Sequence, residues 1–109
     1  MMSYSSVNHR RVPRTLSHLP IQLSFGSQIM VQGQLKDISL KSAFVCMKGN
    51  IYMQPHDEVS FAIQRSLDSA EALVEGWARI SRIADGEGIA IYFTQMDNDS
   101  LSRLKELVG

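Results

Sequence analysis

The longest alternating segment of this chain reads Leu73-Val74-Glu75-Gly76-Trp77-Ala78-Arg79-Ile80-Ser81-Arg82-Ile83. Successive side chains of a β-strand point to opposite faces, so a period of two predicts a strand with one buried face and one face in water. The predicted buried face carries apolar or small residues: Val74, Gly76, Ala78 and Ile80. The predicted outer face carries Glu75, Trp77, Arg79 and Ser81.

Shorter alternating or apolar segments lie on both sides of this one, and they predict strands at 21–25, 29–35, 44–47, 59–64 and 89–93. Turn formers separate them: Gly26-Ser27, the breaker at 54–57, a polar hairpin loop at 65–72 and Asp85-Gly86-Glu87-Gly88. Within the second strand, Gly33 marks either a bulge or a point of close approach. Six short strands at this spacing predict a mainly all-β fold, a small antiparallel barrel or curled sheet.

The period changes at the C-terminal end of the sequence. Leu101, Leu104 and either Leu107 or Val108 recur at helical spacing. The run Asp97-Asn98-Asp99-Ser100 supplies N-cap candidates and places acidic residues near the positive end of the helix dipole. We therefore predict a short C-terminal α-helix packed on the barrel.

Size and composition predict one domain. With 109 residues, 44% hydrophobic and 20% charged, the chain can bury one core without disulfides. We expect a flexible polar tail at 1–8 and a single domain at 9–109. No apolar run is long enough to cross a bilayer, and Met1 to Ser6 lacks the apolar core of a secretory signal, so we expect a cytoplasmic protein without membrane insertion. Cys46 is the single cysteine and is expected to be a small buried hydrophobe.

The charges are unevenly distributed although the formal net charge is zero. Before Asp37 there are four basic residues and no acidic one, hence +4: Arg10, Arg11, Arg14 and Lys36. The remainder holds all 11 acidic residues and seven basic ones, hence −4. A zero net charge argues against general nucleic-acid binding, and a local positive field suits a small anionic ligand better than a polymer.

The sequence gives poor support to an enzyme. His9, His18 and His56 are scattered, without the spacing of a metal site or of a nucleophile and its base. Gly86-Glu87-Gly88 is a turn without a following helix, so it lacks the amides of a phosphate-binding loop. We expect no catalytic residue and no metal ligand.

Two short polar motifs and one aromatic residue remain as binding candidates. Three arginines within five positions, Arg10, Arg11 and Arg14, could hold a compact polyanion, or they could be a solvated feature of the tail. Asp37-Ile38-Ser39 could hydrogen-bond the polar edge of a ligand, or it could shape a turn through hydrogen bonds from side chain to backbone. Trp77, on the outer face, is either a cover for a loop or a stacking platform.

Together these features resemble a known family, the PilZ domain of bacteria. The resemblance rests on Arg10-Arg11-x-x-Arg14, on Asp37-x-Ser39-x-x-Ser42, and on Gly88-Ile89-Ala90-Ile91-Tyr92-Phe93 followed by a short helix. It covers the chain from Arg10 to Val108 and implies a six-stranded antiparallel β-barrel with a C-terminal helix. The family is best known for binding cyclic di-GMP, a dianionic second messenger, so this would be the ligand and no other cofactor is implied.

The resemblance also implies roles for individual residues. Arg10 and Arg14 would be the motif arginines, on a loop that folds over the ligand, and Arg11 would add a phosphate or guanine contact. Asp37 and Ser39 would contact the other guanine. Trp77 matches the position where some members place an aromatic side chain near the bound base.

The sequence departs from the family pattern at Ser42, where the family has glycine. If that glycine needs a positive φ or lies against the ligand, serine is costly and could narrow the site. If the position only needs a small residue, Ser42 is tolerated and its hydroxyl could contribute. His9 precedes the first motif arginine, where the family influences whether one ligand or an intercalated pair binds.

The resulting hypothesis is a cyclic di-GMP effector. Binding of the dianion would order the N-terminal arginine loop onto the barrel, and the new surface would contact an unidentified downstream protein. The alternative is a PilZ-like adaptor that acts through protein contacts without ligand. A third hypothesis is a barrel that binds single-stranded nucleic acid through Trp77 and Tyr92, and the zero net charge argues against it. A hydrolase of the dinucleotide is the least supported hypothesis.

Overall fold

The computed structural model describes residues 14–26, 29–48, 53–69 and 71–108. The remaining positions, 1–13, 27–28, 49–52, 70 and 109, lie outside the described residues. The predicted flexible tail at 1–8 therefore lies outside them, as do His9, Arg10 and Arg11.

Seven strands and one helix make up the described part of the chain. They are β1 (Thr15–Leu16), β2 (Pro20–Phe25), β3 (Ile29–Ile38), β4 (Ser42–Cys46), β5 (Glu58–Gln64), β6 (Ala72–Ala84), β7 (Gly88–Met96) and α2 (Asn98–Val108). Within the described ranges, no helix is long and apolar enough to cross a membrane, since α2 is short and polar.

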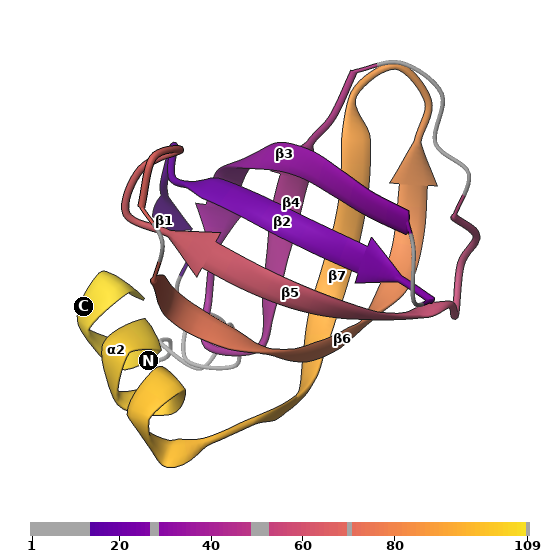
Figure 1. Cartoon of the computed structure of the whole chain (residues 1–109). Helices are drawn as coiled ribbons and strands as arrows, with labels where there is room; N and C mark the ends of the chain where they lie inside the picture. The colour runs from indigo at the N-terminus through magenta and orange to yellow at the C-terminus, as the bar shows by residue number, and fades with distance from the viewer. Residues whose placement is uncertain (1–13, 27–28, 49–52, 70, 109) are drawn as a thin grey trace, which may run out of the picture.

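Six of these strands close into an antiparallel barrel with α2 at one end (Figure 1). Around the barrel, each strand pairs with the next in the order β3-β2-β5-β6-β7-β4, and pairing of β4 back to β3 closes the ring. The predicted fold, a six-stranded antiparallel β-barrel with a C-terminal helix, is confirmed. β1 was not predicted, because two residues are too few to show alternation; it adds to the edge of β3, with Thr15 opposite Ile38.

The barrel interior is filled by the apolar side chains that alternation assigns to the inner face. Residues with no exposed surface come from the barrel strands β2, β4, β5, β6 and β7: Ile21, Leu23, Ala43, Val45, Val59, Ile63, Val74, Ala78, Ile80, Ile89 and Ile91. The rings of Phe61 and Phe93 pack with their centroids 4.9 Å apart. Burial of this apolar surface is the main term that stabilises the fold.

Two irregularities change which side chains face outward. In β3 the register shifts between Leu35 and Asp37, and as a result Lys36 and Asp37 both lie on the outer side while Leu35 and Ile38 are buried. A bulge of this kind inserts one residue into one strand and breaks strict alternation. Of the two alternatives predicted for Gly33, the close approach is confirmed, because a Cβ on Gly33 would lie 2.6 Å from Val45 Cγ1. The bulge of β3 lies further along the strand, between Leu35 and Asp37.

A second shift, in β6, lies between Ile80 and Arg82 in the pairing with β7. Ser81 and Arg82 are consecutive and both exposed, whereas strict alternation would have placed Arg82 on the buried side with Ile80. The outer face predicted for the preceding residues is confirmed, with Glu75, Trp77 and Arg79 exposed.

Cys46 corrects another sequence expectation. It is half-buried rather than buried, because it belongs to the outward set of β4, while its neighbours Val45 and Met47 face the core. Its pairing with Gly88 of β7 places it near the end of the barrel wall.

Helix α2 is fixed to the barrel by its first turn. The Asp97 carboxylate accepts a hydrogen bond from the Ser100 amide (2.8 Å), which is an N-cap at one of the predicted positions. The buried Ser100 hydroxyl accepts a hydrogen bond from the Glu75 amide of β6 (3.0 Å), and Leu104 is fully buried. At the other end, the Thr15 hydroxyl of β1 donates to the Val108 carbonyl (3.1 Å).

Substituting Asp97→Ala is expected to lower the free energy of unfolding by about 1 kcal/mol, because the Ser100 amide loses its cap. Chemical denaturation measures the change. The matched control is Asp68→Ala, which removes the same charge from an exposed loop and should stay within about 0.5 kcal/mol of the wild type. Equal effects of the two substitutions would show that Asp97 does not cap the helix.

Candidate functional site

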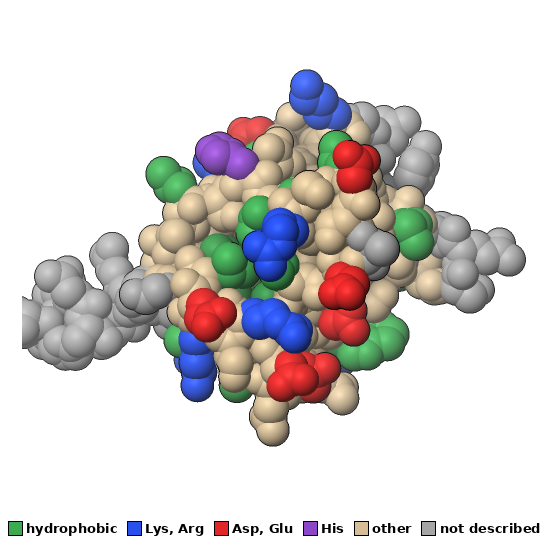
Figure 2. Space-filling view, turned by 60° about the vertical axis from the view of Figure 1, so that its left-hand side comes forward, with side chains coloured by type: hydrophobic (Ala, Val, Ile, Leu, Met, Phe, Trp, Pro, Cys, Tyr) green, Lys and Arg blue, Asp and Glu red, His purple; other side chains and the backbone are tan. Residues whose placement is uncertain are grey.

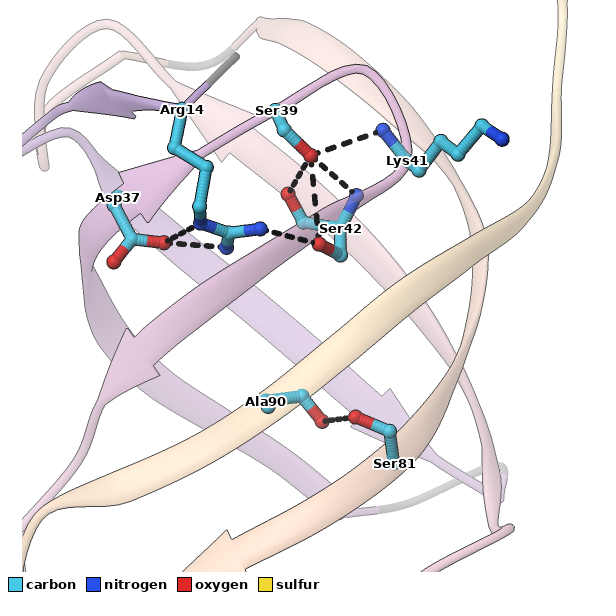
Figure 3. Close-up of polar contacts among 7 residues, drawn as sticks. All are labelled: Arg14, Asp37, Ser39, Lys41, Ser42, Ser81 and Ala90. Atoms are coloured by element: carbon cyan, nitrogen blue, oxygen red, sulfur yellow. Dashed lines mark hydrogen bonds and ion pairs between the residues drawn. The ribbon is translucent and has the colours of Figure 1, made fainter. Parts of the chain in front are cut away.

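The turn between β3 and β4 is organised around the buried hydroxyl of Ser39 (Figure 3). Ser39 Oγ accepts hydrogen bonds from the amides of Lys41 (3.2 Å) and Ser42 (3.0 Å), and it lies 3.2 Å from the Ser42 carbonyl oxygen, to which it can donate. The Ser39 amide donates to the same carbonyl (2.8 Å). A serine that bonds to its own turn in this way holds the backbone in shape.

This turn places Ser42 beside an ion pair between Arg14 and Asp37. Arg14 Nε and Nη2 both donate to Asp37 Oδ1, at 3.0 and 2.5 Å, and Arg14 Nη1 donates to Ser42 Oγ at 2.8 Å. Figure 3 shows the guanidinium lying between the carboxylate and the hydroxyl. Arg14 is thereby joined to two residues that lie 23 and 28 positions later in the sequence.

The network leaves binding capacity unused. A guanidinium has five N–H donors, and three of them are used here, so Nη1 and Nη2 each keep one. Among the residues that the structure describes, Asp37 Oδ2 accepts no hydrogen bond. The two side chains remain 44% and 24% exposed, so a ligand can reach a cation and a carboxylate at adjacent points.

Ser42 does not carry the backbone strain considered for the glycine of the family pattern. It lies within β4, paired with Tyr92 of β7. Among the non-glycine residues in the described ranges, a positive φ occurs at His56 alone. Serine is therefore compatible with this backbone, and its hydroxyl contacts Arg14.

Trp77 lies on the outer wall, separate from the arginine network. It is 45% exposed, and it is paired with Ser60 of β5 on one side and with Gln95 of β7 on the other. It borders a polar hollow of about 520 Å³ on the outer side of β2, β5, β6 and β7. Ser42 pairs with Tyr92, and Tyr92 pairs with Arg79, two residues from Trp77. Two strand spacings across the sheet and two residues along β6 therefore separate Trp77 from the network, roughly 12 Å between backbones.

The structure thus brings together Arg14, Asp37, Ser39 and Ser42, with the buried Ser39 bonded to Ser42 and Arg14 joined to Asp37 and Ser42. Arg10 and Arg11 lie outside the described residues. Sequence reasoning did not assign the outward residues of the neighbouring strands to the site: Lys36, Phe44, Arg79, Arg82 and Tyr92. Outward alternation could have indicated Lys36, Arg79 and Tyr92, but the bulge in β6 hides Arg82 from that signal.

Charge on the remaining surface is mixed. On the face shown in Figure 2, basic and acidic side chains are interspersed around a few hydrophobic ones. A continuous basic stripe, which is the usual footprint of a nucleic-acid-binding surface, is absent from that face. Within the described ranges, no group of three or more His, Cys, Asp or Glu residues is placed to hold a metal ion.

Comparison with known proteins identifies the family. The family profile described as PilZ domain matches residues 8–109, and the chain therefore belongs to the PilZ domain family. PilZ domains are regulatory and adaptor domains, and the family is one of cyclic di-GMP receptors. No curated protein sequence matches the chain.

Two solved structures share the fold. The crystal structure of the PilZ domain of CeSA from a cellulose-synthesizing bacterium matches with a TM-score of 0.63 and 25% identity, covering 87% of this chain and 93% of that one. The Bacillus subtilis inhibitor of motility, MotI/DgrA, matches with a TM-score of 0.73 and 15% identity over 93% of this chain. This chain covers 50% of MotI/DgrA, and at that identity the likeness shows the fold alone.

The burial of Ser39 and the exposure of Arg14 predict that their substitutions destabilise the protein to different extents. Ser39→Ala should lower the free energy of unfolding by about 1–3 kcal/mol, because two partly buried hydrogen bonds to backbone amides lose their acceptor. Arg14→Ala should cost no more than about 1 kcal/mol, since exposed ion pairs contribute little. Urea denaturation of both variants measures the difference.

Ser81→Ala is the control for Ser39→Ala, because the exposed Ser81 hydroxyl makes a single bond to the Ala90 carbonyl (3.1 Å). A Ser39→Ala variant as stable as Ser81→Ala would contradict the structural role of Ser39.

Proposed function

We propose that this protein is a cyclic di-GMP receptor that binds the dinucleotide over Arg14, Asp37 and Ser42. The observation that supports the proposal most directly is the exposed network in which one guanidinium joins a carboxylate and a hydroxyl. Two of its residues, Arg14 and Asp37, match the two motifs of a family of cyclic di-GMP receptors, and Ser42 stands at the glycine position of the second motif.

The chemistry of the network fits this ligand. The free donors of Arg14 can hydrogen-bond a phosphate oxygen or the acceptor edge of guanine, and the flat guanidinium can stack on a purine. The free oxygen of Asp37 is an acceptor for the N–H donors on the Watson–Crick edge of guanine. One cation and one carboxylate side by side therefore match the phosphate and the base of a guanine nucleotide.

Each of the other candidate residues has a place in the proposal. Ser39 holds the β3–β4 turn and so positions Ser42, rather than touching the ligand. Arg10 and Arg11 supply further contacts to phosphate or guanine from the segment before Arg14. Trp77, exposed across the barrel wall, offers a face on which a base can stack.

The output of the proposed receptor is a change at the N-terminal side of the barrel. Arg14 directly precedes β1, and Thr15 of β1 is bonded to the last carbonyl of α2. Binding of a dianion by the arginines would order the segment 8–14 against the barrel next to this helix. The new surface would be read by a downstream protein, in the cytoplasm where the messenger acts, and no catalysis is involved.

A ligand-independent adaptor is the second candidate function. The observation that favours it is the exposure of two leucines. Leu16 of β1, whose strand partner is Asp37 of the arginine network, is 79% exposed, and Leu40 of the β3–β4 turn is 38% exposed. Exposed apolar side chains of this kind suit a protein contact. Failure to bind cyclic di-GMP would favour this candidate.

Calorimetric titration with cyclic di-GMP should show saturable binding to the wild type. Arg14→Ala should weaken it at least tenfold, because charge-assisted hydrogen bonds contribute about 1.5–3 kcal/mol. Arg65→Ala is the matched control, since Arg65 is exposed at the hairpin end of β5, and it should bind like the wild type. Undiminished affinity of Arg14→Ala would exclude this site.

Removing the Ser42 hydroxyl should weaken binding by about three- to tenfold, because one hydrogen bond that orients Arg14, worth about 1 kcal/mol, is lost. Titration of Ser42→Ala measures the effect, and Ser42→Gly restores the residue of the family pattern for comparison. If both variants bind cyclic di-GMP more tightly than the wild type, the hydroxyl obstructs the ligand and does not contribute to its binding.

A further inference from the structure

A second group of cations lies on the outer wall next to the arginine network. It is centred on the ring of Phe44 in β4. Lys36 Nζ lies 5.6 Å from the centroid of this ring, and the guanidinium carbon of Arg82 lies 5.9 Å from it. We name Lys36, Phe44 and Arg82 the Phe44 cluster.

The two cations reach this ring in different ways. Lys36 follows the buried Leu35 and faces outward by alternation, and the register shift in β3 keeps Asp37 on the same side. Strict alternation would have turned Arg82 toward the core, but the register shift in β6 places it on the outer face together with Ser81. Alternation in one strand and a bulge in another therefore bring two positive charges to one aromatic side chain.

No carboxylate neutralises the Phe44 cluster in the described part of the chain. The single Lys or Arg ion pair there is that between Arg14 and Asp37. An aromatic ring attracts a cation only modestly, and two like charges near one ring repel each other. An anion bound between or beside them would remove this repulsion.

The Phe44 cluster continues directly from the arginine network. Asp37, which binds Arg14, is the β3 partner of Phe44; Phe44 pairs with Ala90 of β7, and Ala90 pairs with Arg82 of β6. Ala90 lies between Phe44 and Arg82 and carries only a methyl group, so the Arg82 side chain can cross it to reach the Phe44 ring. A ligand held at Arg14 can extend along this surface to the cations beside Phe44.

We propose that Lys36 and Arg82 form a second anion subsite, which takes a second phosphate of the ligand whose first anchor is Arg14. The proposal rests on the proposed function and extends it. The site prefers an anion with two phosphate groups to an anion with one, because the arginine network holds one phosphate and the Phe44 cluster holds the other. A mononucleotide uses one of the two subsites and gains nothing from the other.

The test compares cyclic di-GMP with GMP on the wild type and on Lys36→Gln, Arg82→Gln and the double variant. Each single variant should weaken binding of cyclic di-GMP by about tenfold, the double variant should weaken it further, and the dependence of its affinity on salt should become shallower. The preference for cyclic di-GMP over GMP should fall in the same order. Arg82→Lys should recover part of the affinity, because the charge is restored.

Arg65→Gln is the matched control. Gln64, the neighbour of Arg65, is paired with Ala72 at the start of β6, ten residues before Arg82, so this substitution removes an exposed charge far from the cluster and should change neither affinity nor preference. Thermal melts of all variants verify that the barrel is folded.

The outcomes separate this inference from the proposed function. If the wild type binds cyclic di-GMP and the folded double variant binds it equally well, the second subsite is wrong while the receptor function stands. If the wild type does not bind cyclic di-GMP, both are wrong.

Discussion

Pairing of β3 with β4 is the constraint on which the barrel and the candidate site both depend. This pairing closes the sheet, so without it the inner faces of six strands would not enclose one core. It is set up by a turn in which the fully buried Ser39 hydroxyl is bonded to the backbone of Lys41 and Ser42. The same turn places Ser42 against Arg14, so closure of the barrel and the geometry of the site depend on the same turn.

The weakness of the Arg14–Asp37 pair suits a binding site. Both side chains are partly in water, where such a pair contributes little to stability. A ligand that offers a phosphate and a guanine edge can therefore take over these groups at small cost to the protein. A fully buried pair would resist such an exchange, because leaving either charge unpaired would be expensive.

Much of the fold follows from alternation and turn chemistry. The segment from Leu73 to Ile80 predicted its buried and exposed faces correctly, and Asp97 was among the predicted N-cap residues. Bulges are decided by how two distant strands pair, so their positions at Lys36 and Ser81 are not visible in one segment of sequence. The two-residue β1 and the outward position of Cys46 escaped prediction because both depend on tertiary pairing.

The candidate site was predicted in part for the same reason. The motifs identified Arg14, Asp37, Ser39 and Ser42, but not that Ser39 would be buried or that one guanidinium would join Asp37 and Ser42. The Phe44 cluster has no local signature, because its cations come from strands more than forty residues apart in the sequence, at Lys36 and Arg82.

A nuclear magnetic resonance titration of the isotopically labelled protein with cyclic di-GMP tests the central claim most directly. The account predicts saturable shifts of the Arg14 Nε signal and of amides in the β3–β4 turn, with smaller shifts at Tyr92 and Ala90 on the neighbouring strand. Shifts confined to a separate hollow, lined by His18, Gln34 and Leu67 among others, or no shifts at all, would contradict it.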